Sequence, residues 1–203
     1  PLKQAADSFM KENPGIKVLL EPAGSVDCAR KITDLNKPCD IMISADYTVI
    51  DKMLIPGHAD WNILFASNEM AIAYSEKSKY ANEINSNNWH EILLRKEVLF
   101  GRSDPNADPC GYRTVMTFDL SERFYQKTGL AKSLLSKDLN FIRPKEVDLM
   151  GLLESGTIDY VFIYRSVAEQ HHMKFVVLPD SVNLKSASLT DWYSQAKVVI
   201  AGK

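Results

Sequence analysis

The chain has 203 residues, with 24 Lys and Arg against 26 Asp and Glu, which gives a net charge of −2. Hydrophobic residues make up 45% and charged residues 25%, and these values exclude collagen-like and disordered classes. The chain lacks the basic surplus of general nucleic-acid binders, so we expect no nucleic-acid partner. Anion binding stays open, because a local field can differ in sign from the net charge. No apolar run approaches the ~18 residues of a membrane-spanning helix.

The first third of the chain alternates helical and strand-like patterns. An apolar stripe predicts a helix over 2–10, which Asn13-Pro14-Gly15 ends. Apolar β-rich runs predict strands at 16–20, 40–44 and 62–65, and helical spacings predict helices at 25–35 and 48–54. This alternating order predicts a parallel sheet with covering helices.

The rest of the chain has the pattern of a second α/β unit. Strands are predicted at 70–74, 98–101, 160–164, 175–178 and 198–200. Helices are predicted at 87–93, 109–124, 131–136, 144–153 and 167–171. The alternation shifts near 62–74 and near 159, which suits two α/β lobes between which the chain crosses. We assign 1–66 to lobe 1, 67–165 to lobe 2 and 166–203 to a return to lobe 1.

Two helix starts in the first lobe draw attention. Gly24 follows a predicted strand and lets the backbone come close to a ligand, and Ser25 can cap the helix that begins there. The exposed N–H groups and the positive dipole end of such a helix suit an oxyanion. An ordinary capped helix explains the same residues. Asp46 opens the next helix and is interpreted as a cap, because its carboxylate would compete with a bound anion.

The stretch from Asp108 to Arg113 is the most informative in the chain. Asp108 occupies an N-cap position and Pro109 the favoured first turn. Gly111 in that turn costs about 1 kcal/mol against Ala, which a helix tolerates when a bare backbone is needed for close approach. A capped helix with an incidental glycine is an equal alternative. Glu146 lies in the first turn of another helix, where a carboxylate normally complements the dipole.

The other candidate residues are assigned structural roles. The three cysteines, Cys28, Cys39 and Cys110, have no metal-ligand spacing and are interpreted as free buried thiols. His58 and His90 lie beside loop-like sequence and are expected to be exposed. The tryptophans are interpreted as packing residues: Trp61, Trp89 and Trp192. His171-His172 lacks partners at any telling spacing for a metal. No phosphate-binding loop and no serine nucleophile elbow occurs.

Five stretches together resemble one known family. They are 22–25, 39–47, 106–113, 142–146 and 154–164. In order and combination they are similar to the tungstate/molybdate-binding proteins of ABC uptake systems, and most of all to the archaeal-type branch. The resemblance implies a type II periplasmic-binding-protein-like fold, with two α/β lobes that close on a ligand in the cleft between them. It implies a binding protein, not an enzyme.

The resemblance also implies a set of ligand contacts. Gly24, Ser25, backbone groups at Pro109, Cys110 and Gly111, and the hydroxyl of Tyr164 would bind the oxygens of the oxyanion. Asp108 and Glu146 would coordinate the metal centre itself. Hexavalent tungsten or molybdenum accepts extra oxygen ligands, whereas sulfate and phosphate do not, so the two carboxylates would repel the latter without compensation. No cofactor is expected beside the tungstate or molybdate ligand.

The resemblance places the protein outside the cytoplasmic membrane, in the periplasm or on the cell surface. It implies a monomer that delivers its ligand to an ABC permease, and that contacts the membrane only through this permease or a lipid anchor. The preference between tungstate and molybdate stays open. Relative to the family, we expect lobe 1 to lack its first strand and the C-terminal return to be incomplete.

Two alternatives remain from sequence. The first is an oxyanion or small-molecule sensor domain of a transcription regulator with the same fold. The second is an enzyme that acts on phosphoryl or sulfuryl groups through Tyr112, Arg113 and Glu146, although no known catalytic constellation supports it.

Overall fold

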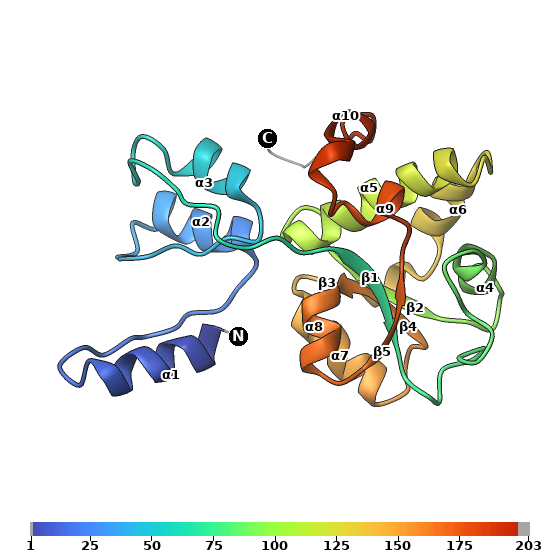
Figure 1. The fold of residues 1–203 in the computed structure, drawn as a ribbon, viewed down its shortest axis with the longest axis horizontal. Helices are drawn as coiled ribbons and strands as arrows, with labels where there is room; N and C mark the ends of the chain where they lie inside the picture. The colour runs from blue at the N-terminus through green and yellow to red at the C-terminus, as the bar shows by residue number, and fades with distance from the viewer. Residues whose placement is uncertain (1, 199–203) are drawn as a thin grey trace.

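The structure is a computed structural model that describes residues 2–198, and it has two parts (Figure 1). We call residues 2–66 the N-terminal lobe and residues 67–198 the sheet lobe. One extended segment, which leads into the first strand, joins the two lobes. The described part of the chain therefore has the α/β character that the sequence predicts.

A five-stranded sheet forms the centre of the sheet lobe, in the order β3-β2-β4-β1-β5. Its strands are β1 (Met70–Tyr74), β2 (Phe100–Ser103), β3 (Ile142–Arg143), β4 (Tyr160–Tyr164) and β5 (Lys174–Val177). β1 runs antiparallel to β4 and β5, and β2 runs parallel to β3 and β4. The sheet is therefore mixed, whereas the parallel sheet predicted from the first third of the chain is not formed in residues 2–66.

Helices cover both faces of this sheet. The helices of the sheet lobe are α4 (Trp89–Leu93), α5 (Pro109–Phe124), α6 (Leu130–Ser136), α7 (Glu146–Glu154), α8 (Arg165–Gln170), α9 (Asp180–Asn183) and α10 (Thr190–Tyr193), with short 3-10 helices at Leu139–Phe141 and Ala187–Leu189. Phe162 faces the cluster that contains Trp89 and Phe118, whereas Val161 and Ile163 face the α7 side. This alternation follows from the two-residue period of a strand, and it makes β4 a fully buried central strand.

The segment expected to return to lobe 1 begins on the sheet lobe. α8 lies over β1, β4 and β5, and β5 itself pairs with β1. Val176, Leu178 and Val182 join the same core cluster as Phe162. The strand predicted at 198–200 lies mostly outside the described residues.

The N-terminal lobe contains three helices: α1 (Leu2–Glu12), α2 (Ser25–Thr33) and α3 (Tyr47–Met53). α2 and α3 pack together through Val26, Ala29, Val49 and Leu54. α1 buries no residue, and Figure 1 shows it apart from the other two helices. The small core of this lobe is therefore built from α2 and α3 alone.

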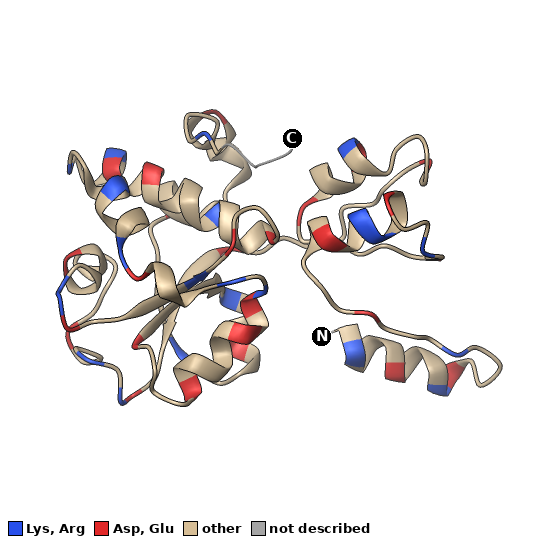
Figure 2. Cartoon of the chain, turned by 180° about the vertical axis from the view of Figure 1, so that it is seen from behind, with Lys and Arg blue, Asp and Glu red and all other residues tan. Residues whose placement is uncertain are grey.

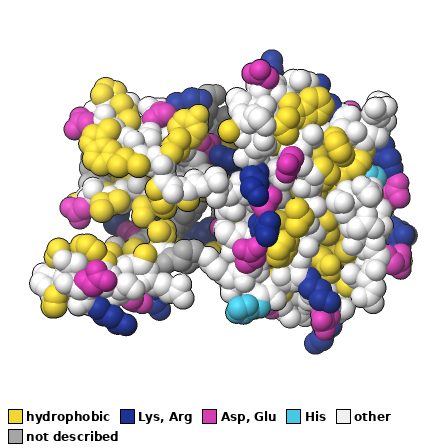
Figure 3. Space-filling model, viewed as in Figure 1, with side chains coloured by type: hydrophobic (Ala, Val, Ile, Leu, Met, Phe, Trp, Pro, Cys, Tyr) yellow, Lys and Arg dark blue, Asp and Glu magenta, His cyan; other side chains and the backbone are white. Residues whose placement is uncertain are grey.

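The strands predicted at 16–20, 40–44 and 62–65 are not formed in residues 2–66. Most of their apolar side chains are exposed, as with Leu19 at 80% and Ile41 at 79%, although Val18 and Met42 are half-buried. Trp61 was expected to pack in a core, but it is exposed. Figure 3 shows hydrophobic side chains gathered over this lobe. An apolar run becomes a strand only when a neighbour takes its backbone N–H and C=O groups, and no segment within 2–66 does so.

Two further side chains differ from expectation. His90 is buried, at 2% exposure, because it lies on α4 with its side chain beside Tyr125. The centroids of the His90 and Tyr125 rings lie 4.4 Å apart. Cys39 is exposed, whereas Cys110 is buried and Cys28 is half-buried, and all three are free thiols. His58 is exposed as predicted.

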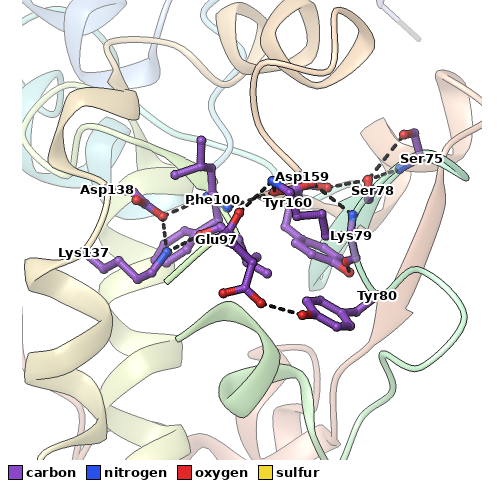
Figure 4. A network of polar contacts seen from close by, with 12 residues as sticks. Ser75, Ser78, Lys79, Tyr80, Glu97, Phe100, Lys137, Asp138, Asp159 and Tyr160 are labelled. Carbon is purple, nitrogen blue, oxygen red and sulfur yellow. Dashed lines mark hydrogen bonds and ion pairs between the residues drawn. The ribbon is translucent and has the colours of Figure 1, made fainter. Parts of the chain in front are cut away.

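A polar network fastens the loop after β1 to the start of β4 (Figure 4). The carboxylate of Asp159 accepts hydrogen bonds from Leu99 N at 2.9 Å and Lys79 N at 3.0 Å. Ser78 Oγ donates to the Asp159 carbonyl at 2.6 Å. Nearby, the Tyr80 hydroxyl donates to Glu97. These contacts all lie within the sheet lobe and fix its frame.

Charged side chains of both signs are distributed over the helices and loops of the two lobes (Figure 2). This distribution accords with the near-neutral net charge. Among the described helices, none is both long and apolar enough to cross a membrane.

Candidate binding site

The first turns of α2, α5 and α7 meet at one place between the two lobes. A Cβ on Gly24, the N-cap residue of α2, would lie 2.5 Å from the carbonyl oxygen of Ala107, just before α5. Gly24 therefore allows the start of α2 to approach the start of α5, which side-chain-bearing residues could not do without displacement. The sequence identified these helix starts one by one, and the structure brings them together.

Asp108 joins α5 to α7. Its Oδ1 accepts a hydrogen bond from Cys110 N at 3.1 Å, as an N-cap should. Its Oδ2 accepts a second bond from Glu146 N at 3.0 Å, at the first residue of α7. One carboxylate thus caps two helices. Burial raises the pKa of Asp108, and these two N–H groups oppose that rise.

Glu146 lies next to this cap. Burial is the main cause that raises the pKa of its carboxyl from 4.5 to about 7, and the negative charge of Asp108 adds to the rise. Its Oε2 is buried and has no hydrogen-bond partner among the described residues. A buried carboxyl group with a raised pKa and an unpartnered oxygen is typical of a functional site.

Other buried polar atoms near Glu146 also have no partner in the described part of the chain. They are Tyr164 Oη and Arg113 Nε. Burial raises the pKa of Tyr164, and the charges of Glu146 and Asp108 add to the rise whereas Arg113 opposes it. An unsatisfied buried polar group costs about 1–3 kcal/mol, and such groups are rare in native proteins. Several of them in one place point to a polar ligand.

The structure places Ser25 differently from its expected role as a cap. Gly24 holds the N-cap position of α2, with no side-chain cap, and Ser25 is the first helical residue. Its hydroxyl accepts a hydrogen bond from Ala45 N at 3.0 Å, which ties α2 to the loop before α3. The hydroxyl is nearly buried and keeps its own proton available for donation.

The first turn of α5 holds Pro109, Cys110 and Gly111, all of them buried. Cys110 N donates to Asp108 Oδ1, and Gly111 N donates to the Asp108 carbonyl at 2.9 Å. A Cβ on Gly111 would lie 2.5 Å from the carbonyl carbon of Asp104. Packing of the preceding loop therefore explains this glycine. Burial raises the pKa of the Cys110 thiol, whose Sγ lies 3.7 Å from the Phe162 carbonyl oxygen.

Sequence reasoning did not include Asp46, Tyr112 and Arg113 in the binding site, and considered Tyr112 and Arg113 only for the enzyme alternative. Asp46 caps α3 by accepting from Thr48 N, as predicted, but it also accepts from the Tyr112 hydroxyl. Arg113 Nη2 lies 3.9 Å from Asp46 Oδ1. Burial opposes the ionised form of Asp46, but Tyr112, Thr48 and Arg113 together lower its pKa. The sequence could have indicated Tyr112 and Arg113 only through their position, directly after Cys110 and Gly111 in the first turn of α5.

Residues 2–198 contain no group of three or more His, Cys, Asp or Glu side chains arranged to hold a metal ion. Asp108 and Glu146 supply carboxylate oxygens from two helix starts and are joined through the backbone of α7. Two carboxylates of this kind suit a centre that already carries oxygen ligands of its own.

Comparisons with known proteins identify the family of this chain. A model of the family described as bacterial extracellular solute-binding protein matches residues 1–196. A solute-binding protein of Petrotoga mobilis is 49% identical over the whole chain and 64% of its own length. The molybdate/tungstate-binding protein WtpA of Thermococcus kodakarensis is 43% identical over 98% of the chain and 63% of its own length. The resemblance noted from sequence is thereby confirmed.

Among solved structures, the periplasmic molybdate-binding protein of Azotobacter vinelandii superposes with a TM-score of 0.62 at 17% identity, over 98% of this chain and 88% of that one. This likeness confirms the α/β fold class of periplasmic binding proteins. The chain spans somewhat less than two thirds of the length of the curated relatives that it matches first.

Proposed function

Because this chain belongs to the family of bacterial extracellular solute-binding proteins, we propose that it captures tungstate or molybdate outside the cytoplasmic membrane for delivery to an ABC permease. The names of two relatives, both molybdate/tungstate-binding proteins at 43% and 44% identity, support this ligand. The protein acts as a receptor that binds and releases its ligand unchanged.

One observation carries the proposal: Glu146 Oε2 is buried without a partner beside Asp108. In its ionised form, a carboxylate oxygen aimed at sulfate or phosphate repels that ligand, since like charges repel. Tungsten or molybdenum in its hexavalent state is a hard centre that accepts carboxylate oxygens. In this proposal, Glu146 Oε2 repels sulfate or phosphate but coordinates the metal centre of tungstate or molybdate.

The remaining groups bind the ligand oxygens. Tyr164 Oη and Ser25 Oγ supply hydroxyl donors, one from the end of β4 and one from the start of α2. Gly24 and the turn of Pro109, Cys110 and Gly111 place helix N-termini at the same point. The N–H groups of Cys110 and Gly111 donate hydrogen bonds to oxygens of Asp108 in this structure. In this proposal the same N–H groups also donate hydrogen bonds to the ligand. Helix N-termini favour negative charge, which offsets part of the repulsion from the carboxylates.

The test is calorimetric titration of the full-length protein with tungstate, molybdate, sulfate and phosphate. Binding of tungstate or molybdate with little sulfate binding supports the proposal, and absence of tungstate binding refutes it. Glu146→Gln is the informative variant, because Oε2 makes no internal hydrogen bond that the amide would break. Asp108→Asn is less clean, because its amide nitrogen would face one of two N–H donors.

We expect Glu146→Gln to lose tungstate affinity at least tenfold, with sulfate binding unchanged or stronger. Glu154→Gln is the matched control, since Glu154 lies at the exposed end of the same helix. Equal preference for tungstate over sulfate in Glu146→Gln and the wild type would show that the site is a plain hydrogen-bonded pocket.

A further inference from the structure

A buried polar contact joins the two lobes beside the candidate site. Asp46 belongs to the N-terminal lobe and caps α3, whereas Tyr112 belongs to the first turn of α5 in the sheet lobe. The Tyr112 hydroxyl donates a hydrogen bond to Asp46 Oδ2, and both residues are at most 8% exposed. Arg113 approaches the other oxygen of Asp46 at 3.9 Å. We call Asp46, Tyr112 and Arg113 the interlobe cluster.

The local structure of neither lobe requires this contact. The cap of α3 uses only Asp46 Oδ1, which accepts from Thr48 N at 2.9 Å. The Tyr112 hydroxyl makes no bond within α5, so its partner across the lobes is what satisfies it. A hydrogen bond from a hydroxyl to an ionised carboxylate is among the stronger kinds, and burial strengthens it further.

The cluster shares its helix turn with the candidate site. Tyr112 and Arg113 directly follow Cys110 and Gly111 on α5. Burial opposes the charged form of Arg113, but the negative charge of Asp46, which lies 3.9 Å from Arg113 Nη2, raises its pKa. A movement that separates Asp46 from Tyr112 would also separate Gly24 from Ala107. Opening of the lobes at this point would therefore break the cluster.

We propose that the interlobe cluster is a latch that holds the two lobes closed before the ligand binds. The hydrogen bond from Tyr112 to Asp46 raises the closed fraction of the ligand-free protein. Since only closed protein presents all its ligand contacts at once, the apparent dissociation constant falls as this fraction rises. The effect on affinity rests on the proposed function, but the effect on shape does not.

Small-angle X-ray scattering of the ligand-free, full-length protein tests the latch. Tyr112→Phe removes only the hydroxyl, and Asp46→Ser keeps an oxygen that can cap α3 but that is too short to reach Tyr112. Both variants should have a larger radius of gyration than the wild type. Tyr80→Phe is the matched control, because it also breaks a bond from a tyrosine to a carboxylate, Glu97, but within the sheet lobe (Figure 4). It should leave the radius unchanged.

Tungstate titration gives the second readout. Each latch variant should bind about tenfold more weakly and release faster. The double variant should lose little more than Asp46→Ser alone, because that change already breaks the bond to Tyr112 together with the contact to Arg113. An unchanged radius of gyration in Tyr112→Phe and Asp46→Ser would overturn the latch, even if the affinity fell. Additive losses in the double variant would overturn it as well. If the wild type binds no tungstate, the proposed function fails, and the scattering result still decides the latch.

Discussion

Replacement of Gly24 by Ala tests whether the approach of the two lobes governs ligand binding. The backbone of Gly24 has φ −58° and ψ 144°, which alanine adopts without strain. Its new Cβ would lie 2.5 Å from the carbonyl oxygen of Ala107, about 1 Å inside an ordinary contact. The consequence of Gly24→Ala must therefore come from this contact and not from the local backbone.

The loop that carries Ala107 cannot easily yield. Ala107 N and Asp108 N both donate to the Asp104 carbonyl, at 3.1 and 3.0 Å. The start of α2 must therefore move away from α5, which separates the lobes at the site. Overpacking of this size costs about 1–3 kcal/mol, which corresponds to a loss of tungstate affinity of roughly 5- to 150-fold.

Titration calorimetry and a thermal melt of the same samples separate the two possible effects. We expect Gly24→Ala to lose affinity while its melting temperature stays close to that of the wild type, because the clash lies between lobes. Gly151→Ala is the control, since a Cβ there meets nothing within 4 Å. Wild-type affinity in Gly24→Ala would refute the idea that this contact closes the site.

Three further predictions concern stability. Gly111→Ala should lower the melting temperature by roughly 3–12 °C, because its Cβ would lie 2.5 Å from backbone atoms of Asp104 within one lobe; an unchanged melt would contradict this packing. Burial lowers the pKa of His90, so the unfolded chain binds this proton at a higher pH than the folded chain does, and the stability falls as the pH drops below about 6.5. His90→Leu should therefore lose less melting temperature than the wild type between pH 7 and pH 5. An equal loss of melting temperature in the two proteins would contradict this role of His90. The raised pKa of Glu146, about 7, acts in the opposite direction: its contribution is full below pH 4.5 and is lost as the pH rises through 7, by on the order of 3 kcal/mol. Glu146→Gln should flatten that part of the stability profile of the ligand-free protein, and a profile parallel to the wild type would contradict the buried carboxyl.

Elements with strong local signals were predictable. α5 begins at Pro109 behind the Asp108 cap, as proline and cap preferences require, and β1 and β4 cover the predicted runs. The prediction of strands in the N-terminal lobe was wrong. Residues 16–20 and 40–44 have the apolar, β-branched composition of strands, but within the described residues no neighbouring segment pairs with their backbones. Pairing is a long-range property that a local pattern does not contain.

In the candidate site, too, local features were predictable from the sequence and long-range contacts were not. The sequence indicated Asp108 as a cap, but not that its second oxygen accepts from Glu146 N, 38 residues away. Likewise Asp46 was predicted as a cap, and its bond to Tyr112 was not. Gly111 was suspected of approaching a ligand, and the structure shows the Asp104 loop there instead. Local signals identify which residue begins a helix, whereas the fold decides what its free atoms face.

X-ray absorption spectroscopy at the tungsten edge of the tungstate-loaded protein tests the central claim most directly. The proposal that Asp108 and Glu146 coordinate the metal centre predicts an expanded, octahedral-like oxygen shell, with two longer bonds from carboxylates. In Glu146→Gln, at least one of these longer bonds should disappear from the spectrum. A tetrahedral tungstate shell in the wild type, identical to that of the free ion, would contradict the coordination role of both carboxylates.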